Sequence, residues 1–554
     1  MSYTMEKYQS PEWHPSWQLK CIFAVVGLLN FVAALDATSI SVALPTISED
    51  LGGTATEAFW AGTSFLVASC VFQPVFSLAS DIFGRKPILI TAVVSFTLGS
   101  ILAAVAKGFA LLLVGRSFQG IGGGGIMVLT EILIADLIPL RERGKWFSIR
   151  SGTWALGTVV GPLIGGGFTE SSASWRWIFW INLPFCGLGL ILIPIFLKLN
   201  TTQIPPLRES LKRIDYIGSF LFVASLTSFL IPITWGGTMY AWDSWHTLVP
   251  LILGVAGLIG FCMYERFIAT QPLIPLVIFN NVTMSVSYAG CFLHGVILWA
   301  VVYYLPLYYE GSLGYKPVIA GIAMFPECFT VAPISVITGF ICAKVGRYRW
   351  ALWFGWPVTI LGIGLLCLLD SETSIPKWLF INLVAGVGVG TLYPTVMLAV
   401  QAAANPEYLS ISVSMTPFFR VFGQAVGVAI GGVVFQNRII HEFGDHPSLG
   451  RSALAYAQDA SSLVQYIHTL PKSSAERNLL ESLYAKALVI VWAVMCGIGG
   501  LALLLSLFTK DYTLNQALSS KQGLQGRPSN DVESGGSGDS GDSRESSEKE
   551  KALE

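Results

Sequence analysis

Charged residues are scarce in this sequence: they make up 12% of its 554 residues, where a typical soluble domain has about 25%. The formal net charge of −1 provides no global electric field that would attract nucleic acid. None of the nine cysteines belongs to a C-x-x-C pair, and the Gly-Lys-Ser/Thr motif of phosphate-binding loops is absent. These absences argue against a nucleic-acid-binding protein, a metal-binding domain built on paired cysteines, and an ATP-driven machine.

Signatures of enzymes are equally sparse. Only one of the six histidines, His294, falls within an apolar run, and neither H-x-x-x-H nor G-x-S-x-G occurs. We therefore predict that the protein is not an enzyme, and that it binds neither a metal ion nor another cofactor.

Long apolar runs are abundant, since hydrophobic residues make up 53% of the sequence. About twenty apolar residues form a helix that crosses the roughly 30 Å hydrocarbon core of a bilayer, and such a helix satisfies its own backbone hydrogen bonds. The sequence thus predicts an all-α polytopic membrane protein that carries a small molecule across a bilayer. We count about fourteen candidate spans: 21–45, 58–80, 87–106, 109–134, 147–169, 177–198, 214–234, 248–267, 284–308, 318–342, 350–369, 377–401, 412–435 and 485–508.

Basic residues are distributed unevenly between the loops that join these spans. The loops after the second, fourth, sixth and tenth spans are basic, whereas residues 46–57 contain no Lys or Arg. Because basic loops stay in the cytosol, this pattern places the loops after even-numbered spans, and both termini, on the cytosolic side. The basic residues concerned are Arg85, Lys86, Arg141, Arg143, Lys145, Arg208, Lys212, Arg213, Lys344, Arg347 and Arg349.

Two glycosylation sequons occur, Asn200-Thr-Thr and Asn281-Val-Thr. Both fall on the cytosolic side in this topology, whereas acceptor sequons are surface sites of secreted chains, so we expect no glycosylation at either one. A glycan at Asn200 would invert the topology.

The order of the spans and a change in composition divide the chain into five parts. We expect a cytosolic N-terminus at 1–20, an N-terminal six-helix half at 21–200, and a linker with two extra helices at 201–280. A C-terminal six-helix half at 281–510, with an external loop at about 436–484, follows. The stretch from Ser529 is rich in Ser, Gly and acidic residues. Such a composition buries too little apolar surface to fold, so 511–554 is predicted to be a disordered acidic tail.

The turn between the second and third spans combines Asp81, Gly84, Arg85 and Lys86. Gly84 permits a tight turn, and Asp81 is expected to pair with a basic residue or to cap a helix. Arg85 and Lys86 hold the loop in the cytosol. Topology alone explains the two basic residues, but not the acid and the glycine at this spacing.

Two further motifs lie inside spans. Arg116 lies several residues inside the fourth span, where an unpaired charge is costly, and the glycines that follow it allow another helix to approach closely. In the fifth span, glycines recur every four residues on one helical face, and a proline bends the helix by freeing a carbonyl. The fifth-span motif consists of Gly157, Gly161, Pro162, Gly165 and Gly166.

In this order and in these spans, the motifs resemble the signatures of the major facilitator superfamily. The turn is similar to its loop signature, Arg116 with Gln119 and Gly120 to its fourth-span signature, and the glycine-proline set to the fifth-span motif of its antiporters. Ser77 departs from the loop signature, which usually opens with glycine. The resemblance implies a major-facilitator fold of two six-helix halves, here with two extra helices between them, energised by a proton gradient.

More residues resemble the fourteen-span drug:proton antiporters, especially fungal pumps for toxins and secondary metabolites. This resemblance implies efflux of a small, amphipathic organic molecule by alternating access. The alternative is a proton-coupled importer on the same fold, such as a siderophore-chelate transporter, but the fifth-span motif favours efflux. A fainter copy of the loop signature follows the tenth span, at the position where an internal repeat of the chain would put it. The residues concerned are Leu35, Asp36, Thr38, Pro45, Trp175, Arg176, Trp177, Asn182, Pro184, Trp235, Gly236, Gly237, Tyr303, Tyr304, Pro306, Phe419, Arg420, Gly423, Gln424, Gly427, Gly431, Gly432 and Asn437, and for the copy Gly339, Lys344, Gly346 and Arg347.

Few ionisable residues lie deep in the spans, and each is a functional candidate because burying it unpaired costs several kcal/mol. Asp36 and Arg116 lie at matching depths, so we expect them to pair, a proton on Asp36 to free Arg116, and the substrate to compete for the same groups. A fixed structural ion pair is the alternative. The other candidates for proton coupling or transport are Glu131, Arg420 and Glu327, with His294 beside Glu327 as a second proton or substrate site. Glu131 is either a gating or substrate carboxylate or a solvated residue at the cytosolic edge, and Arg420 either pairs with an acid or binds an anionic group of the substrate.

Aromatic and amide side chains in the spans are expected to line a central cavity and set selectivity, although helix packing or lipid contact explains each of them equally well. The expected partners are the lipid bilayer, a small-molecule substrate and protons, with no nucleic acid, and the protein is expected to be a monomer. The expected location is the cell (plasma) membrane, with a vacuolar or vesicle membrane as the alternative. The candidate cavity residues are Gln73, Gln119, Trp154, His294, Tyr304, Tyr393 and Gln424.

Overall fold

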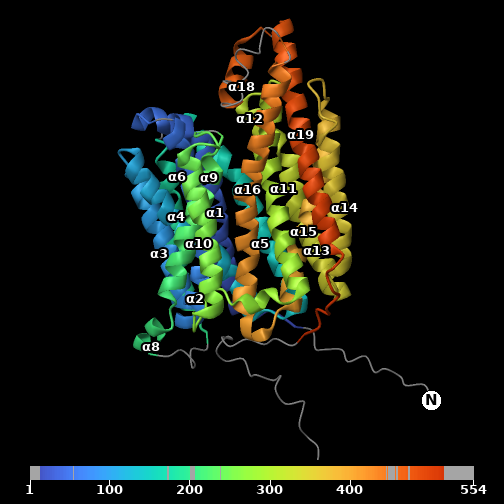
Figure 1. Ribbon diagram of the computed structural model, residues 1–554. Helices are drawn as coiled ribbons and strands as arrows, with labels where there is room; N and C mark the ends of the chain where they lie inside the picture. Colours follow the sequence, from blue (N-terminus) through green and yellow to red (C-terminus); the bar gives the residue numbers. More distant parts are fainter. Residues whose placement is uncertain are drawn as a thin grey trace, which may run out of the picture.

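The structure, a computed structural model, describes residues 13–53, 55–170, 174–199, 206–237, 239–444, 446, 456, 460–471 and 474–516. Residues 1–12, the tail after 516 and the sequon at Asn200 lie outside the described residues. The described chain forms long helices that run side by side from the top to the bottom of Figure 1.

The helices fall into an N half, an extra pair and a C half, named in chain order. The N half comprises α1 (Trp17–Leu51), α2 (Ala55–Phe83), α3 (Arg85–Ala104), α4 (Phe109–Leu137), α5 (Leu140–Glu170), α6 (Trp177–Trp180) and α7 (Asn182–Phe196). The short α8 (Leu207–Lys212) leads to the extra pair, α9 (Tyr216–Trp235) and α10 (Trp245–Phe267), which the 3-10 turn η1 (Leu276–Phe279) follows. The C half comprises α11 (Val282–Gly311), α12 (Pro317–Ala323), α13 (Phe325–Val345), α14 (Arg349–Leu366), α15 (Ile375–Ala403), η2 (Pro406–Tyr408), α16 (Leu409–Gly444), α18 (Ala460–Thr469) and α19 (Ala475–Ser506).

Thirteen helical stretches in the described residues are long and apolar enough to cross a membrane. They coincide with the predicted spans except at 147–169, where α5 forms a helix of 31 residues that is too polar to be counted. Charged residues in the first turns of α5, from Arg141 to Lys145, and its many glycines explain this lower hydropathy. Because α5 packs along α1 and α13, it still belongs to the bundle. The prediction of an all-α polytopic membrane protein is confirmed.

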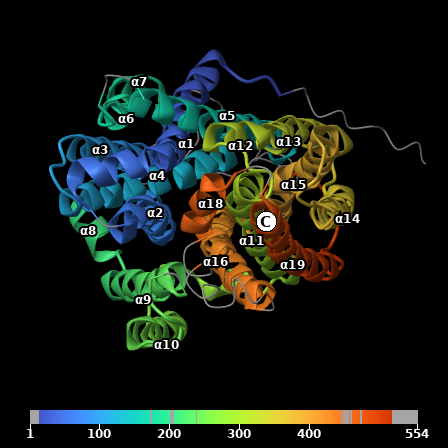
Figure 2. The same ribbon diagram turned by 90° about the horizontal axis from the view of Figure 1, so that it is seen from above.

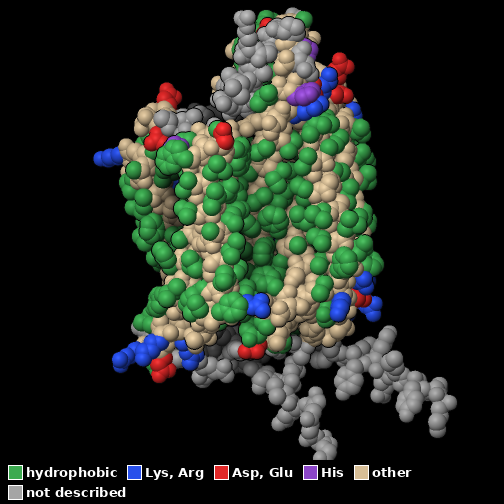
Figure 3. Space-filling view, in the orientation of Figure 1, with side chains coloured by type: hydrophobic (Ala, Val, Ile, Leu, Met, Phe, Trp, Pro, Cys, Tyr) green, Lys and Arg blue, Asp and Glu red, His purple; other side chains and the backbone are tan. Residues whose placement is uncertain are grey.

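Large apolar side chains cover the sides of the bundle as a broad band, and charged side chains gather towards its two ends (Figure 3). On α10, for example, Ile252 and Leu253 are each 62% exposed. Exposed apolar surface of this extent fits contact with lipid rather than with water. The end of the bundle with the basic loops after α2, α4, α7 and α13, at the bottom of Figure 1, is called the basic end below.

Glycines on α4 explain how tightly the N half packs. A Cβ on Gly122 would lie 2.4 Å from the backbone nitrogen of Phe96 in α3, and one on Gly124 would lie 2.4 Å from the carbonyl oxygen of Ser69 in α2. The helix α4 is therefore held between α2 and α3 at backbone distance, the close approach that its glycine run predicts.

The extra pair lies outside the two halves, where α9 contacts α2 and α16 and α10 packs on α9 (Figure 2). The ring of Phe222 in α9 lies 5.7 Å, between centroids, from that of Phe418 in α16. Trp235 lies at the same distance from Trp60 in α2. The pair therefore covers the seam between the halves from the lipid side.

The halves contact each other closely at the basic end. A Cβ on Gly339 of α13 would lie 2.4 Å from the carbonyl oxygen of Gly144 in α5. One turn further along α5, Ser148 Oγ donates a hydrogen bond of 2.6 Å to the carbonyl of Ser335. These contacts bring the two helices to backbone distance and close the basic end of the bundle.

Two regions differ from their predicted limits. The region expected as an external loop, 436–484, contains the end of α16, the helix α18 and the beginning of α19. Residues 511–516, assigned to the tail from the sequence, lie against the C half: Leu514 is fully buried, and its N–H donates a 3.0 Å hydrogen bond to the carbonyl of Gly346. A single apolar residue in a polar stretch gave no signal strong enough to predict this contact.

Candidate functional site: a polar cavity between the halves

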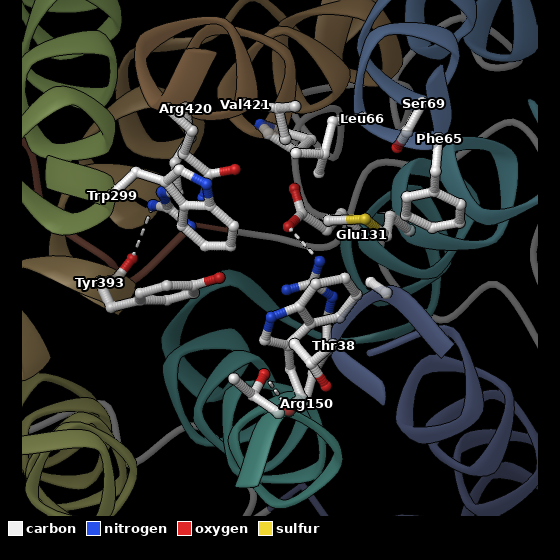
Figure 4. A pocket seen from close by; sticks show the side chains of 16 residues that line it. Thr38, Phe65, Leu66, Ser69, Glu131, Arg150, Trp299, Tyr393, Arg420 and Val421 are labelled. Atoms are coloured by element: carbon white, nitrogen blue, oxygen red, sulfur yellow. Dashed lines mark hydrogen bonds and ion pairs between the residues drawn. The ribbon is translucent and has the colours of Figure 1, made fainter. Parts of the chain in front are cut away.

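A cavity lies between the two halves and holds about 700 Å³ of empty space. Helices α1, α2, α4 and α5 line it on one side, and α11, α15 and α16 line it on the other (Figure 4). Side chains in its wall include Thr38, Phe65, Ser69, Met127, Glu131, Arg150, Trp154, Trp299, Tyr393, Arg420 and Gln424.

Glu131 of α4 and Arg150 of α5 form an ion pair in the wall of the cavity. Arg150 Nη2 lies 3.1 Å from Glu131 Oε1, and neither side chain is more than 5% exposed. The other carboxylate oxygen, Oε2, and Arg150 Nε have no hydrogen-bond partner among the described residues. Buried polar atoms usually have partners, so these two are open positions for polar groups of a ligand.

Arg420 of α16 reaches the cavity from the opposite half. Its guanidinium carbon lies 3.9 Å from the centroid of the Tyr393 ring, and its Nη2 donates a 3.2 Å hydrogen bond to the Tyr393 carbonyl (Figure 4). No carboxylate of the described chain lies within ion-pair distance of it. One carboxylate therefore faces two guanidinium groups in this cavity.

The structure brings Asp36 and Arg116 together, as their matching depths predict. Arg116 Nη1 lies 2.5 Å from Asp36 Oδ2, and both side chains are fully buried. The other oxygen of Asp36 accepts hydrogen bonds from Gln119 Nε2 at 2.8 Å and from Asn182 Nδ2 at 2.7 Å. Both amides also lie within hydrogen-bond distance of Ser100 Oγ. Helices α1, α3, α4 and α7 are thus joined by one polar network inside the N half.

Phe65 of α2 separates this network from the cavity. The Arg116 guanidinium lies 4.7 Å from the centroid of the Phe65 ring, and the same ring lines the cavity. Arg116 Nε also donates a 2.9 Å hydrogen bond to the carbonyl of Ala61, one turn earlier on α2. Asp36 is fully buried and absent from the lining, so the cavity does not reach its carboxylate in this conformation, and competition by substrate for this group stays a prediction.

The turn between α2 and α3 forms an ion-pair cluster at the basic end. Arg85 pairs with Asp81 and, through Nε at 2.9 Å, with Asp136 at the end of α4. Gly84 has a φ of +93°, a conformation that other residues rarely adopt. The acid and the glycine that topology left unexplained therefore shape this turn and tie it to α4.

Arg143 and Lys86 extend this cluster to other helices. Arg143 Nη2 donates a 2.6 Å hydrogen bond to the Ala135 carbonyl of α4, and its Nη1 donates one of 3.0 Å to Gln401 Oε1 of α15. Lys86 Nζ donates to a carbonyl of α7 at 3.0 Å. Arg143 thereby joins the end of α4 in the N half to the C half.

The fifth-span glycines lie against α1, as their spacing predicts. A Cβ on Gly157 or Gly165 would lie 2.5 Å or 2.2 Å from a backbone carbonyl of α1, and one on Gly161 would lie 2.1 Å from Thr38 Oγ1. Gly166 is off this face, because the atom nearest to its Cβ would be a valine methyl group at 3.7 Å. The α1 residues on this face lie on both sides of Asp36 in the sequence, so the motif supports the helix that carries this acid.

Gly165→Ala is expected to destabilise the protein, since its new methyl group would overlap the Ser39 carbonyl of α1. Overpacking of this kind costs about 1–3 kcal/mol. The measurement is the thermal unfolding midpoint of the purified protein. Gly166→Ala is the matched control, and we expect it to stay within about 0.5 kcal/mol of the wild type. Equal midpoints for the two variants would show that the glycine face is not tightly packed.

Three of the predicted cavity residues, Trp154, Tyr393 and Gln424, lie in the lining. Gln119 belongs instead to the Asp36 network. Tyr304 packs α11 on α16, where its hydroxyl donates a 2.8 Å hydrogen bond to the Val428 carbonyl. Aromatic residues that line a cavity and aromatic residues that pack one helix on another both occur in apolar helices, so the sequence alone did not distinguish them. Pro162 lies inside α5, as predicted.

Gln73, His294 and Glu327 are buried but absent from the lining. His294 Nε2 lies 3.2 Å from the Val389 carbonyl, whereas Glu327 receives a long contact of 3.7 Å from the neighbouring Cys328 thiol. In the described part of the chain, no hydrogen bond or ion pair joins His294 to Glu327. The structure therefore does not bring them together as a second proton site.

Sequence reasoning missed Arg150, Phe65 and Trp299 in the cavity. Arg150 lies close to the basic loop after the fourth span and was not among the buried ionisable candidates. A usable signal was its position, since it lies inside the predicted span at 147–169 and needs a partner there. Phe65 and Trp299 carried no signal, because aromatic residues in spans face lipid as often as a cavity.

The chain matches the family model described as the Major Facilitator Superfamily over residues 26–428. A curated relative, MFS transporter L2 of a Phoma species, is 48% identical over 94% of this chain and 86% of its own length. The MFS-type efflux pump LUC4 of a Fusarium species is 36% identical over 91% of this chain and 90% of its own. The Acurin A biosynthesis cluster MFS-type transporter of Aspergillus aculeatus is also 36% identical, over 91% of each chain.

Solved structures agree on the fold. The human organic anion transporter MFSD10 has a TM-score of 0.56 at 15% identity and covers 89% of this chain and 100% of its own. The proton:xylose symporter XylE has a TM-score of 0.52 at 15% identity and covers 85% and 99%. With the two halves around a central cavity, and relatives of matching length along nearly the whole sequence, the chain belongs to the major facilitator superfamily and is a multi-pass membrane transporter rather than an enzyme.

Proposed function

We propose that the protein is a proton-coupled efflux transporter that exports a small, amphipathic organic molecule by alternating access. The observation that carries this proposal is the arrangement of two buried polar sites on either side of Phe65: the cavity and the Asp36 network. Relatives named as efflux pumps and as members of biosynthesis clusters support a toxin or secondary metabolite as the cargo.

The proposed proton step follows from the Asp36 network. A proton on Asp36 removes the negative charge that holds Arg116 Nη1, while Arg116 Nη2 already lacks a hydrogen-bond partner among the described residues. Arg116 then moves relative to Ala61 and Phe65, which it contacts on α2. Because Phe65 is also cavity wall, protonation changes the shape of the cargo site without direct contact between cargo and Asp36.

The closed basic end supports a conformation that faces the other side of the membrane. With the basic loops in the cytosol, the contacts between α5 and α13 seal the cytosolic side. Export then requires these contacts to open so that cargo enters from the cytosol, and to close again before it leaves. We propose the plasma membrane as the location, and a monomer as the working unit, because one chain contains both halves and the whole cavity.

Inside-out vesicles that contain the protein are expected to accumulate cargo when their lumen is acidic. The vesicles are incubated with an extract of small molecules from the native host, and mass spectrometry measures which compounds enter. We expect at least one compound to enter several-fold more than in vesicles without the protein, and this excess to vanish when an ionophore collapses the pH gradient. Accumulation that does not depend on the pH gradient would refute proton coupling. Loss of a preloaded compound from the vesicles, driven by the gradient, would establish import.

A further inference from the structure

The charge balance of the cavity is uneven. Glu131 pairs with Arg150 at 3.1 Å, is 2% exposed, and also interacts electrostatically with Arg420. Arg420 is 4% exposed and contacts the Tyr393 carbonyl, the Tyr393 ring and the Cys291 thiol. Among the described residues, no carboxylate pairs with it. One carboxylate is therefore shared by two guanidinium groups, so this part of the cavity wall carries one more positive charge than negative charge.

A buried charge without a partner is unfavourable, and within a membrane it costs several kcal/mol unless water or an opposite charge compensates it. The surroundings of Arg420 supply only the carboxylate of Glu131, which Arg150 already pairs with, but they do fix the position of the guanidinium. The Tyr393 ring lies against one face of the guanidinium, and the Tyr393 carbonyl binds Nη2. Its Nε has no hydrogen bond. A planar guanidinium held in this way has an open donor edge, which suits a carboxylate or another delocalised anion.

We propose that the cargo is an anion: an amphipathic molecule whose carboxylate or enolate group pairs with Arg420. Its apolar body lies against Trp154, Trp299 and Phe65, which line the same cavity. This inference rests on the proposed transport function and names its substrate class.

The same geometry disfavours cationic cargo. A cation would enter a space where two guanidinium groups face one carboxylate, and that carboxylate is already paired. A neutral amphipath would bury its apolar body equally well but would leave the excess positive charge of the cavity wall unbalanced. The preference for an anion is therefore a property of Arg420, and not of the apolar wall.

The test compares matched probes on the purified full-length protein. A panel of aromatic and alkyl carboxylic acids, naphthoic acid among them, is measured beside the neutral primary amide of each acid. Equilibrium dialysis gives affinity, and the thermal unfolding midpoint reports stabilisation. We expect the acids that bind to do so at least about tenfold more tightly than their amides, which corresponds to about 1.4 kcal/mol. Arg420→Gln is expected to remove this preference, and Arg420→Lys is expected to keep part of it.

Two further measurements separate this inference from a folding defect and from the proposed function. Without any probe, Arg420→Gln is expected to be at least as stable as the wild type, because it removes the excess buried positive charge while Glu131 keeps its ion pair with Arg150. Arg347→Gln, at the surface of the basic end, is the control and should keep the acid preference. Equal binding of acids and amides, no binding by any acid, or an acid preference that survives in Arg420→Gln would overturn the inference. Gradient-independent transport together with an intact acid preference would overturn only the proton coupling.

Discussion

Asp36→Asn is expected to abolish proton-driven export while exchange of cargo across the membrane continues. Asparagine keeps an oxygen that accepts hydrogen bonds from Gln119 and Asn182, but it carries no negative charge to hold Arg116. The variant therefore resembles the protonated state permanently. We expect gradient-driven accumulation in vesicles to fall on the order of 100-fold, because coupling free energies between two sites are typically about 1–3 kcal/mol. Exchange of labelled for unlabelled cargo at equal pH should persist.

Asp50→Asn is the matched control, since it removes an acid from the far end of the same helix. Asp50 is about half exposed and accepts hydrogen bonds from Trp175 and Arg176. These two hydrogen bonds lower the pKa of Asp50, so this carboxyl stays ionised near neutral pH and does not act as a proton carrier. Its substitution should leave export unchanged. Retained gradient-driven export by Asp36→Asn would show that the Asp36–Arg116 pair is a fixed structural ion pair.

A destabilised Asp36→Asn protein would lose both export and exchange, so a second variant is needed. Neutralising one partner of a buried pair leaves the other charge uncompensated, which costs about 3–5 kcal/mol when the partner is removed outright. The double variant Asp36→Asn with Arg116→Gln removes both charges and should recover much of this stability. If the double variant folds and exchanges cargo but its export still does not respond to the pH gradient, the loss of export is caused by the missing proton step and not by misfolding.

The Asp36–Arg116 pair could be predicted from the sequence, whereas the cavity could not, and the reason is physical. A charge inside an apolar helix is rare and costly, so two opposite charges at matching depth in different spans have a strong reason to meet. The loop and glycine motifs carry similar information. Gly84 adopts a positive φ, and Gly165 lies against the backbone of α1, so both positions require glycine. Fold class and helix packing follow from such residues.

Cavity residues lack a signal of that kind. Trp299 lines the cavity and Tyr304, one turn and a residue later on α11, packs on α16, yet both are aromatic residues in the same apolar helix. Which one faces the cavity depends on how the two halves are placed against each other. That placement depends on contacts between distant segments, such as Ser148 with Ser335, that no local pattern encodes. Arg150, the partner of Glu131, is different, because its place inside the predicted span at 147–169 was a usable signal.

The basic end contains the other element that the proposed cycle must move. Arg85 ties the α2–α3 turn to α4 through Asp136, and Arg143 ties the end of α4 to Gln401 in the C half. Beside this polar network, α5 and α13 cross at glycines. Opening towards the cytosol therefore has to break this polar network and the close backbone contact between α5 and α13 at the same time. Closing depends on the absence of side chains at the crossing of these two helices.

Gly339→Leu is expected to prevent this closure and to hold the protein with its basic end open. The first side-chain carbon alone would lie 2.3 Å from Ser148 Oγ and 2.4 Å from the Gly144 carbonyl oxygen. Overpacking costs about 1–3 kcal/mol, so the closed form loses roughly 5–150-fold in population relative to the open form. Export in vesicles should fall in proportion, and cargo should still bind from the cytosolic side.

Thiol labelling can show that Gly339→Leu changes the conformation and does not simply unfold the protein. Ser148→Cys, in a background with the nine native cysteines replaced, places a thiol at the crossing. An impermeant maleimide added to inside-out vesicles should label it several-fold faster in the Gly339→Leu protein than in its parent. The matched control is Gly152→Leu on α5, where no atom lies within 4 Å of the added Cβ, so labelling and export should match the parent. A protein that cannot close at this crossing must expose the Ser148 position to the cytosol. If the Gly339→Leu protein lost export but its labelling rate stayed unchanged, the basic end would therefore not open at this crossing.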